Sequence, residues 1–175
     1  MKFSKENNFA FIDGANLHHG MMSLGWKLDY KKFRVWLTEK FSVTRAYIFL
    51  GNIPKYNKLY ARLQECGYTL IFKEVVYDGD GKAKGNCDAD LVLKVVQEYY
   101  EEGYDNAVII SSDGDYASLV SFLLEKKRLK FILSPSSEKK CSVLLRRTGA
   151  KISYVNSQRA HLEKIEKAPD GDGTP

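Results

Sequence analysis

The sequence predicts an α/β fold with a central, mostly parallel β-sheet and helices on both faces. Short apolar runs alternate along the chain with longer amphipathic stretches. These runs are continuously apolar, as in strands that are buried on both faces of a parallel sheet. Because strands that alternate with helices build parallel sheets covered by helices, the order of the segments indicates the same class.

Six apolar runs are predicted strands, and most of the stretches between them are predicted helices. The strands cover residues 9–12, 45–50, 69–76, 107–111, 130–133 and 151–155. The helices cover residues 30–41, 55–66, 88–102, 116–127 and 138–147. In the fourth helix, Leu119, Phe122 and Leu123 recur at the three- and four-residue spacing of one helix face.

The chain is long enough for a single domain with its own core. At 175 residues it can bury about two-thirds of the surface that its unfolded form exposes. We expect one domain over residues 1–160, followed by a helix end and a disordered tail over residues 161–175, where KAPDGDGTP offers nothing to anchor a core. The glycine- and lysine-rich segment 77–86, YDGDGKAKGN, is predicted to be a mobile loop.

Composition excludes several classes of protein. The apolar patch at residues 9–12 is too short for a signal peptide, and no run approaches the roughly 18 apolar residues of a membrane span. Cys66, Cys87 and Cys141 are far apart and form no C-x-x-C pair, so neither disulfides nor a thiolate zinc site is expected. We therefore expect a cytoplasmic protein without membrane contact.

The net charge is +5, with an isoelectric point near 9.0. The excess lies in short clusters at residues 31–34, 126–130, 139–140 and 146–147. Such clusters attract polyanions, but solvated helix faces have the same composition. Charge alone leaves both interpretations open.

Acidic residues stand at the ends of predicted strands. Asp113 and Asp115 follow one strand in AVIISSDGDYASLV, Asp13 follows another in FIDGANL, and Asp88 opens a helix in KGNCDADLVL. In open α/β sheets the carboxyl ends of the strands face the ligand-binding crevice. Carboxylates gathered there repel one another unless protons or cations intervene.

Helix capping is the alternative explanation for these acids. Ser112 and Asp115 have the spacing of a capping box, and Asp13 with Asn16 has the pattern of a cap for a short helix. Capping explains one acid for each helix start and leaves the second acid of the DGD segment unexplained. A carboxylate-rich site suits Mg²⁺ or Mn²⁺, and phosphate chemistry is the commonest use of such a site.

Three motifs together resemble the NYN domain, the LabA-like branch of the PIN-like nuclease superfamily. They are FIDGANL at residues 11–17, KGNCDADLVL at residues 84–93 and IISSDGDYASLV at residues 109–120. The resemblance covers residues 8–156. It implies a Rossmann-like PIN fold and a divalent-metal-dependent hydrolase that cleaves phosphodiester bonds, in RNA more often than in DNA.

The resemblance also implies a role for each matching residue. Asp13, Asp88, Asp113 and Asp115 would bind Mg²⁺ or Mn²⁺ and carry catalysis. Asn16, Ser111, Ser112 and Lys84 would contact the substrate or orient the carboxylates. In-line attack by an activated water would then leave a 5′-phosphate and a 3′-hydroxyl.

The chain departs from the family pattern at two positions. Ser112 stands where many relatives have glycine, and Lys94 stands where some relatives have another acid. Asp90 either replaces that acid or is an exposed helix residue. A lysine in the pocket would weaken the binding of a second metal ion by charge repulsion.

Other readings remain open at this point. A binding module that holds RNA or a protein without cleavage is the main alternative, whereas Toprim-like and phosphatase sites fit the strand-end acids less well. His18 and His19 are assigned to a loop or helix surface. Trp26, Phe33 and Trp36 either support a homodimer or pack in the core.

Overall fold

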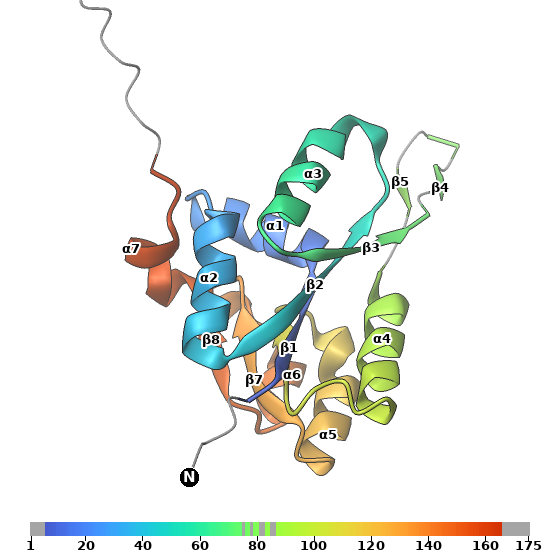
Figure 1. Ribbon diagram of the computed structural model, residues 1–175, viewed down its shortest axis with the longest axis vertical. Helices are drawn as coiled ribbons and strands as arrows, with labels where there is room; N and C mark the ends of the chain where they lie inside the picture. Colours follow the sequence, from blue (N-terminus) through green and yellow to red (C-terminus); the bar gives the residue numbers. More distant parts are fainter. Residues whose placement is uncertain (1–5, 75, 78, 81–82, 85–86, 166–175) are drawn as a thin grey trace, which may run out of the picture.

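The computed structural model describes residues 6–74, 79–80 and 87–165, and the backbone alone of residues 76–77 and 83–84. A six-stranded sheet with the strand order β3-β2-β1-β6-β7-β8 forms its centre (Figure 1), and every pairing within it is parallel. The strands are β1 (Asn8–Asp13), β2 (Val43–Gly51), β3 (Thr69–Lys73), β6 (Ala107–Ile110), β7 (Leu129–Ser134) and β8 (Ile152–Tyr154). The predicted α/β fold class is confirmed.

Helices cover both faces of this sheet. One face packs against α1 (Gly14–Leu24), α2 (Tyr30–Phe41), α3 (Asn57–Glu65) and α7 (Arg159–Leu162), and the other against α4 (Asp88–Tyr100), α5 (Ala117–Glu125) and α6 (Val143–Arg147). Because neighbouring side chains of a strand point to opposite faces, β1 sends Ala10 and Ile12 into the first layer and Phe9 and Phe11 into the second. Two hydrophobic cores therefore enclose the sheet.

Three segments differ from the sequence-based prediction. The predicted helix 138–147 is divided at Cys141 and Ser142 into the 3-10 helix η3 (Glu138–Lys140) and α6. The segment after β1 forms α1, a helix of 11 residues that buries Leu17, Gly20 and Met21. The predicted strand 69–76 ends at Lys73, and parts of the predicted loop 77–86 pair as an antiparallel hairpin of β4 (Val76–Tyr77) and β5 (Ala83–Lys84). Neighbouring histidines and two glycines obscure the helical pattern of α1. The tail residues 166–175 lie outside the described residues.

The strand order reverses between β1 and β6. From β1 the chain proceeds to β2 and β3 on one side, whereas from β6 it proceeds to β7 and β8 on the other. Such a reversal opens a crevice at the carboxyl ends of the two central strands, because their connections leave in opposite directions. Asp13 ends β1 and Ser111 follows β6 directly, so the acidic motifs begin at this crevice.

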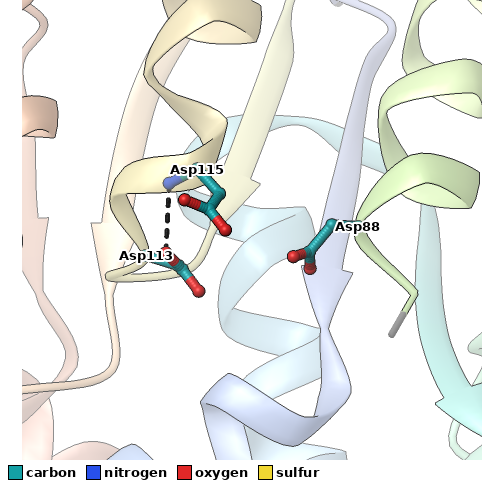
Figure 2. A group of neighbouring side chains, drawn as sticks. All are labelled: Asp88, Asp113 and Asp115. Carbon is teal, nitrogen blue, oxygen red and sulfur yellow. Dashed lines mark hydrogen bonds between the residues drawn. The ribbon is translucent and has the colours of Figure 1, made fainter. Parts of the chain in front are cut away.

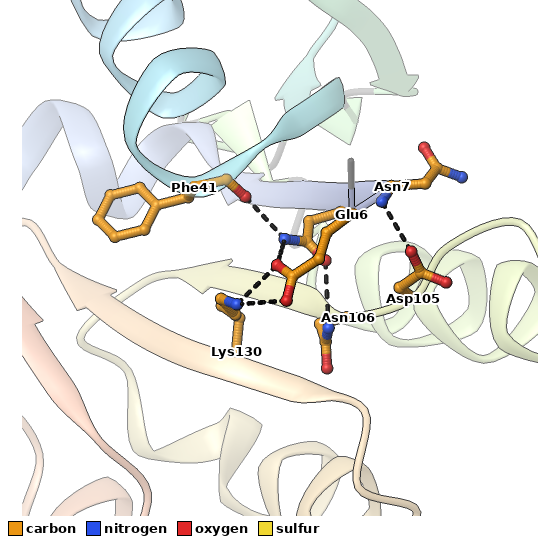
Figure 3. A network of polar contacts seen from close by, with 7 residues as sticks. Glu6, Asn7, Phe41, Asp105, Asn106 and Lys130 are labelled. Carbon is orange, nitrogen blue, oxygen red and sulfur yellow. Dashed lines mark hydrogen bonds and ion pairs between the residues drawn. The ribbon is translucent and has the colours of Figure 1, made fainter. Parts of the chain in front are cut away.

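A polar network ties the strands together near the start of β1 (Figure 3). Lys130 of β7 donates to both carboxylate oxygens of Glu6, at 2.9 and 2.6 Å. Asn8 donates to Glu6 and to the carbonyl oxygen of Phe41, and it accepts from Asn106. These bonds link β1 to β7, to the end of α2 and to the loop before β6. The network lies at the opposite end of β1 from Asp13.

The aromatic residues considered for a dimer pack inside the molecule. Trp26 and Phe33 are buried, and Trp36 lies against Phe33 and Phe41 with ring centroids 6.0 and 4.9 Å away. Core packing therefore accounts for them. The described part of the chain contains no helix both long and apolar enough to cross a membrane.

Gly14 allows α1 to begin directly against β2. A Cβ atom at this position would lie 2.4 Å from Leu50 Cδ2 and 2.6 Å from the carbonyl oxygen of Phe49. We expect Gly14→Ala to lower the free energy of unfolding by about 1–3 kcal/mol, the usual cost of overpacking. Urea denaturation measures this, with Ala15→Ser at the exposed next position as the control. Equal stability of both variants would contradict the close packing of α1.

Candidate metal centre

Three carboxylates converge at the crevice (Figure 2). Asp88 is the first residue of α4, Asp113 follows β6, and Asp115 belongs to the short 3-10 helix η2 (Gly114–Tyr116). One oxygen from each lies within 4.8 Å of the others. Asp88 and Asp113 are partly buried and Asp115 is exposed. The second and third of the three sequence motifs therefore meet in space.

Local hydrogen bonds determine the shape of the turn that carries Asp113. Its carboxylate accepts from the backbone N–H of Asp115 at 3.0 Å, so Asp113 caps η2. Its own N–H donates to Ser111 Oγ at 3.1 Å, and Ser111 is fully buried. Ser111 therefore holds the backbone of Asp113 in place, and its contact with a substrate stays a prediction.

Ser112 connects this turn to α1. Its N–H and its hydroxyl both donate to Asn16 Oδ1 at 2.9 Å. The alternative of a capping box of Ser112 with Asp115 is excluded, because Asp113 caps η2 and the hydroxyl of Ser112 donates to Asn16 instead. The two bonds fix the side chain of Asn16 at the edge of the site and leave its Nδ2 as a donor. Serine at this position thus adds a link between α1 and the DGD turn.

Asp13 lies beside the three carboxylates and is only 7% exposed. Oδ1 of Asp13 accepts a hydrogen bond from the backbone N–H of Asn16 at 2.9 Å. Asp13 therefore caps α1, in agreement with the helix-capping explanation. Oδ2 contacts the hydroxyl of Tyr116 at 3.1 Å, and the same hydroxyl lies 2.5 Å from Asp88 Oδ1. Asp13 thus both caps α1 and belongs to the acidic site.

Tyr116 was not foreseen as a site residue. It is fully buried under the site and bridges Asp13 to Asp88. A phenol has a single hydrogen, so it can donate to only one of the two carboxyl groups at a time. Its position directly after the DGD segment could have indicated that Tyr116 lies near the site. Its contact with Asp88, however, joins residues 28 positions apart and depends on the tertiary fold.

Burial dominates the electrostatics of this pair. It raises the pKa of Asp13, the bonds from Asn16 and Tyr116 act in the opposite direction, and the nearby Asp88 and Asp113 raise it further. Burial and the two carboxyl groups also raise the pKa of Tyr116 far above its ordinary value, so the phenol stays protonated. Burial raises the pKa of Cys87 to about 11, which keeps this neighbouring thiol neutral.

Three of the four carboxylates face a cleft of about 690 Å³. Asp13, Asp88 and Asp113 line one end of it, and α1 and α3 contribute the exposed side chains of His18, His19 and Leu59. The described residues that line the cleft include no lysine or arginine. Negative charge at this end is therefore not neutralised by side chains of the lining.

Lys94, which departs from the family pattern, and Asp90, its possible replacement, both pair with residues outside the cleft. Lys94 Nζ pairs with Glu98 at 2.7 Å and lies over the ring of Tyr47, and it does not line the cleft. Asp90 pairs with Lys73 of β3 at 3.0 Å, so it does not replace the missing acid. The backbone of Lys84 belongs to β5, whereas its side chain lies outside the described residues.

The three converging residues fit a hard divalent cation. Their donors are all carboxylate oxygens, which Mg²⁺ and Mn²⁺ prefer. Two oxygens on opposite sides of Mg²⁺ are about 4.2 Å apart, given bonds of about 2.1 Å. The observed span of up to 4.8 Å is close to this value, and the exposed side chain of Asp115 has room to rotate.

The fold and the acidic crevice define a PIN-like α/β protein with a nuclease-like architecture. The family model of the NYN domain matches residues 9–154, so the chain belongs to the NYN domain family. Members of this family usually are nucleases that use divalent metals. The NYN assignment made from the three motifs is confirmed.

Two similar proteins cover nearly the whole chain. The low amplitude and bright protein LabA of Synechococcus elongatus is 24% identical over 177 residues, which span 95% of this chain and 93% of LabA. The crystal structure of VPA0982 from Vibrio parahaemolyticus, described as a protein of unknown function, superimposes with a TM-score of 0.71 at 20% identity. That match covers 93% of this chain and 99% of VPA0982, and it supports the fold alone.

We expect Asp13→Asn to stabilise the metal-free protein at pH 7. The raised pKa of Asp13 means that the native state holds more protons than the unfolded state between the two pKa values, so stability falls as pH rises through that window. An amide avoids this cost, keeps an oxygen for the Asn16 N–H and can donate to the phenol oxygen of Tyr116.

Urea denaturation in EDTA between pH 4 and pH 7 tests this expectation. The advantage of Asp13→Asn should shrink toward about pH 4, where an unfolded aspartate becomes protonated. Asp105→Asn, at the other end of the sheet, is the control. A variant that is less stable than the wild type at pH 7 would contradict the inferred cost of burying Asp13.

The bridging hydroxyl of Tyr116 gives a second stability prediction. Tyr116→Phe should lower the free energy of unfolding in EDTA by about 1.5–3 kcal/mol, because hydrogen bonds to charged groups contribute that much. Tyr104→Phe is the matched control, since this buried phenol donates to the neutral carbonyl of Val95 at 3.1 Å. Its expected cost is about 0.5–1.5 kcal/mol. Equal losses, measured by urea denaturation, would show that the carboxyl bridge contributes nothing special.

Proposed function

We propose that this protein is a divalent-metal-dependent nuclease that hydrolyses phosphodiester bonds in RNA. The observation that carries the proposal is the convergence of Asp88, Asp113 and Asp115 beside a cleft whose described lining holds no lysine or arginine. Membership of the NYN family supports the same chemistry. RNA is preferred to DNA because NYN domains commonly bind RNA.

Asp88, Asp113 and Asp115 would hold Mg²⁺ or Mn²⁺. The buried Asp13 would add to the negative charge of this site from the side of the core. When bound, the metal neutralises phosphoryl oxygens and lowers the pKa of an attacking water. Hydrolysis would leave a 5′-phosphate and a 3′-hydroxyl.

In this proposal Asn16 orients the phosphate. Its Oδ1 accepts two hydrogen bonds from Ser112, so the Nδ2 group remains to donate to a phosphate oxygen. Asn16 lines the same cleft as Asp13 and Asp113. The bonds from Ser112 restrict the rotation of the amide, which reduces the entropy lost when the phosphate is positioned.

The alternative is a binding module without cleavage, which Lys94 as a positive charge in the pocket and the unknown geometry of a second metal site would favour. Lys94 instead pairs with Glu98 outside the cleft, which removes the first of these two arguments. We further propose a reducing, cytoplasmic location, which agrees with three free cysteines at positions 66, 87 and 141.

The test compares cleavage by two aspartate variants. We expect Asp113→Asn to lower the rate of cleavage of a labelled structured RNA at least 100-fold in Mn²⁺ or Mg²⁺, because it removes charge from the converging oxygens. Asp90→Asn is the matched control, since Asp90 pairs with Lys73 and should leave the rate within twofold. EDTA should abolish cleavage by the wild type.

Single-stranded DNA of matching sequence is included as a second substrate. Faster cleavage of DNA than of RNA would contradict the proposed substrate. RNA binding without cleavage in either metal would instead indicate the binding module. An equal loss of activity in both aspartate variants would show that cleavage does not depend on the converging carboxylates in particular.

A further inference from the structure

A second cleft, of about 830 Å³, continues from the acidic one. It lies where the end of α1, the start of α2 and the end of α3 come together, close to Lys164. The two clefts share His18, Tyr30, Leu59 and Leu63 as lining residues, so they form one continuous groove. A ligand that occupies the acidic end can therefore extend past α3 without leaving the surface.

The charge of the second cleft is opposite to that of the first. Lys27, Lys31, Arg62 and Lys164 line it, and all four are exposed. No ion pair within the described part of the chain engages Lys31, Arg62 or Lys164. These three cations are available to an anionic ligand.

Asp29 is the one acidic residue among the described residues that line the second cleft. Its Oδ1 accepts from the backbone N–H groups of Lys31 and Lys32, both at 3.0 Å, so it caps α2. This carboxylate is occupied by the helix start. The cleft thus keeps an excess of positive charge.

Apolar side chains are exposed beside these cations. Met22 of α1 is 67% exposed and Leu59 of α3 is 38% exposed, and both line the second cleft. Trp26 and Leu28 are buried behind them. Phosphates pair with cations, whereas the faces of unpaired bases pack on apolar and aromatic groups, so this combination matches a single strand. In a duplex the base faces are stacked on one another and would leave Met22 and Leu59 without a partner.

We propose that the second cleft binds a single-stranded RNA segment that leads away from the phosphate to be cleaved. The identity of the strand as RNA rests on the proposed function, whereas the binding surface rests on the charges and apolar groups of the groove. Lys31 and Arg62 contact phosphates, and Met22 and Leu59 pack against bases. The volume of about 830 Å³ lies within the range of about 300–1,000 Å³ that is typical of binding clefts.

The experiment measures binding separately from cleavage. The full chain carries Asp113→Asn to prevent cleavage, and a fluorescent 15-nucleotide oligouridylate is titrated in EDTA at several salt concentrations. Lys31→Glu combined with Arg62→Glu is compared with Lys139→Glu combined with Lys151→Glu, which makes the same change of charge at exposed positions outside both clefts. Thermal unfolding verifies that both double variants fold.

We expect the groove double variant to bind at least tenfold more weakly and the control to bind within threefold of the parent. The slope of log affinity against log salt should fall by about 1.4 in the groove variant, because each phosphate contact to a single strand contributes about 0.7. Equal weakening in the two double variants would overturn the proposal, since it would show only a general effect of net charge.

Two further measurements distinguish this proposal from the alternatives of duplex binding and of DNA binding. Met22→Ser should weaken binding of the single strand about threefold and leave binding of an RNA duplex unchanged, and an equal effect on both would overturn the base contact. Tighter binding of single-stranded DNA of matching length than of RNA would overturn the RNA assignment. If the wild type never cleaves RNA but the groove variant still loses binding, the proposed function fails and the groove assignment stands.

Discussion

Repulsion between like charges is the constraint around which this structure is arranged. Asp13, Asp88, Asp113 and Asp115 gather at the point where the strand order reverses, and the described lining of the cleft offers no lysine or arginine to compensate them. Each acid near the core is therefore occupied by hydrogen-bond donors, namely the Asn16 N–H, the Asp115 N–H and the Tyr116 hydroxyl. These donors reduce the repulsion, but burial, together with the smaller effect of the charges on Asp88 and Asp113, still raises the pKa of Asp13.

Much of this arrangement was predictable because it is local in sequence. A continuously apolar strand followed by an acid indicates a carboxylate at the crevice of a parallel sheet, and this held for Asp13 and Asp113. The cap of Asp13 on α1 was also readable, since Asn16 follows three residues later. The helix α1 itself was readable only from Leu17 and Met21, four residues apart, amid glycines and histidines that disfavour a helix.

The directions of side chains were harder to predict, because they depend on partners from distant elements. Lys94 stands on the helix that carries Asp88, so the sequence placed it near the pocket. The i,i+4 spacing of Lys94 and Glu98 suggested an ion pair on the helix. The direction of this pair, however, depends on Tyr47 of β2, which donates to Glu98 at 2.6 Å and packs under the lysine. The bridge from Tyr116 to Asp88 likewise needs the packing of η2 against α4.

The two clefts divide the charge of a basic protein into regions of opposite sign. A net charge of +5 attracts a polyanion to the molecule as a whole, but an acidic centre repels the same polyanion at short range. A groove that begins at the carboxylates and continues among Lys31, Arg62 and Lys164 resolves this conflict, since distant phosphates gain contacts that offset the repulsion at the centre. A cation bound by the carboxylates would then have to neutralise only the phosphate beside it. Binding and chemistry can thus be separated along one continuous surface, with α1 and α3 shared between the two parts.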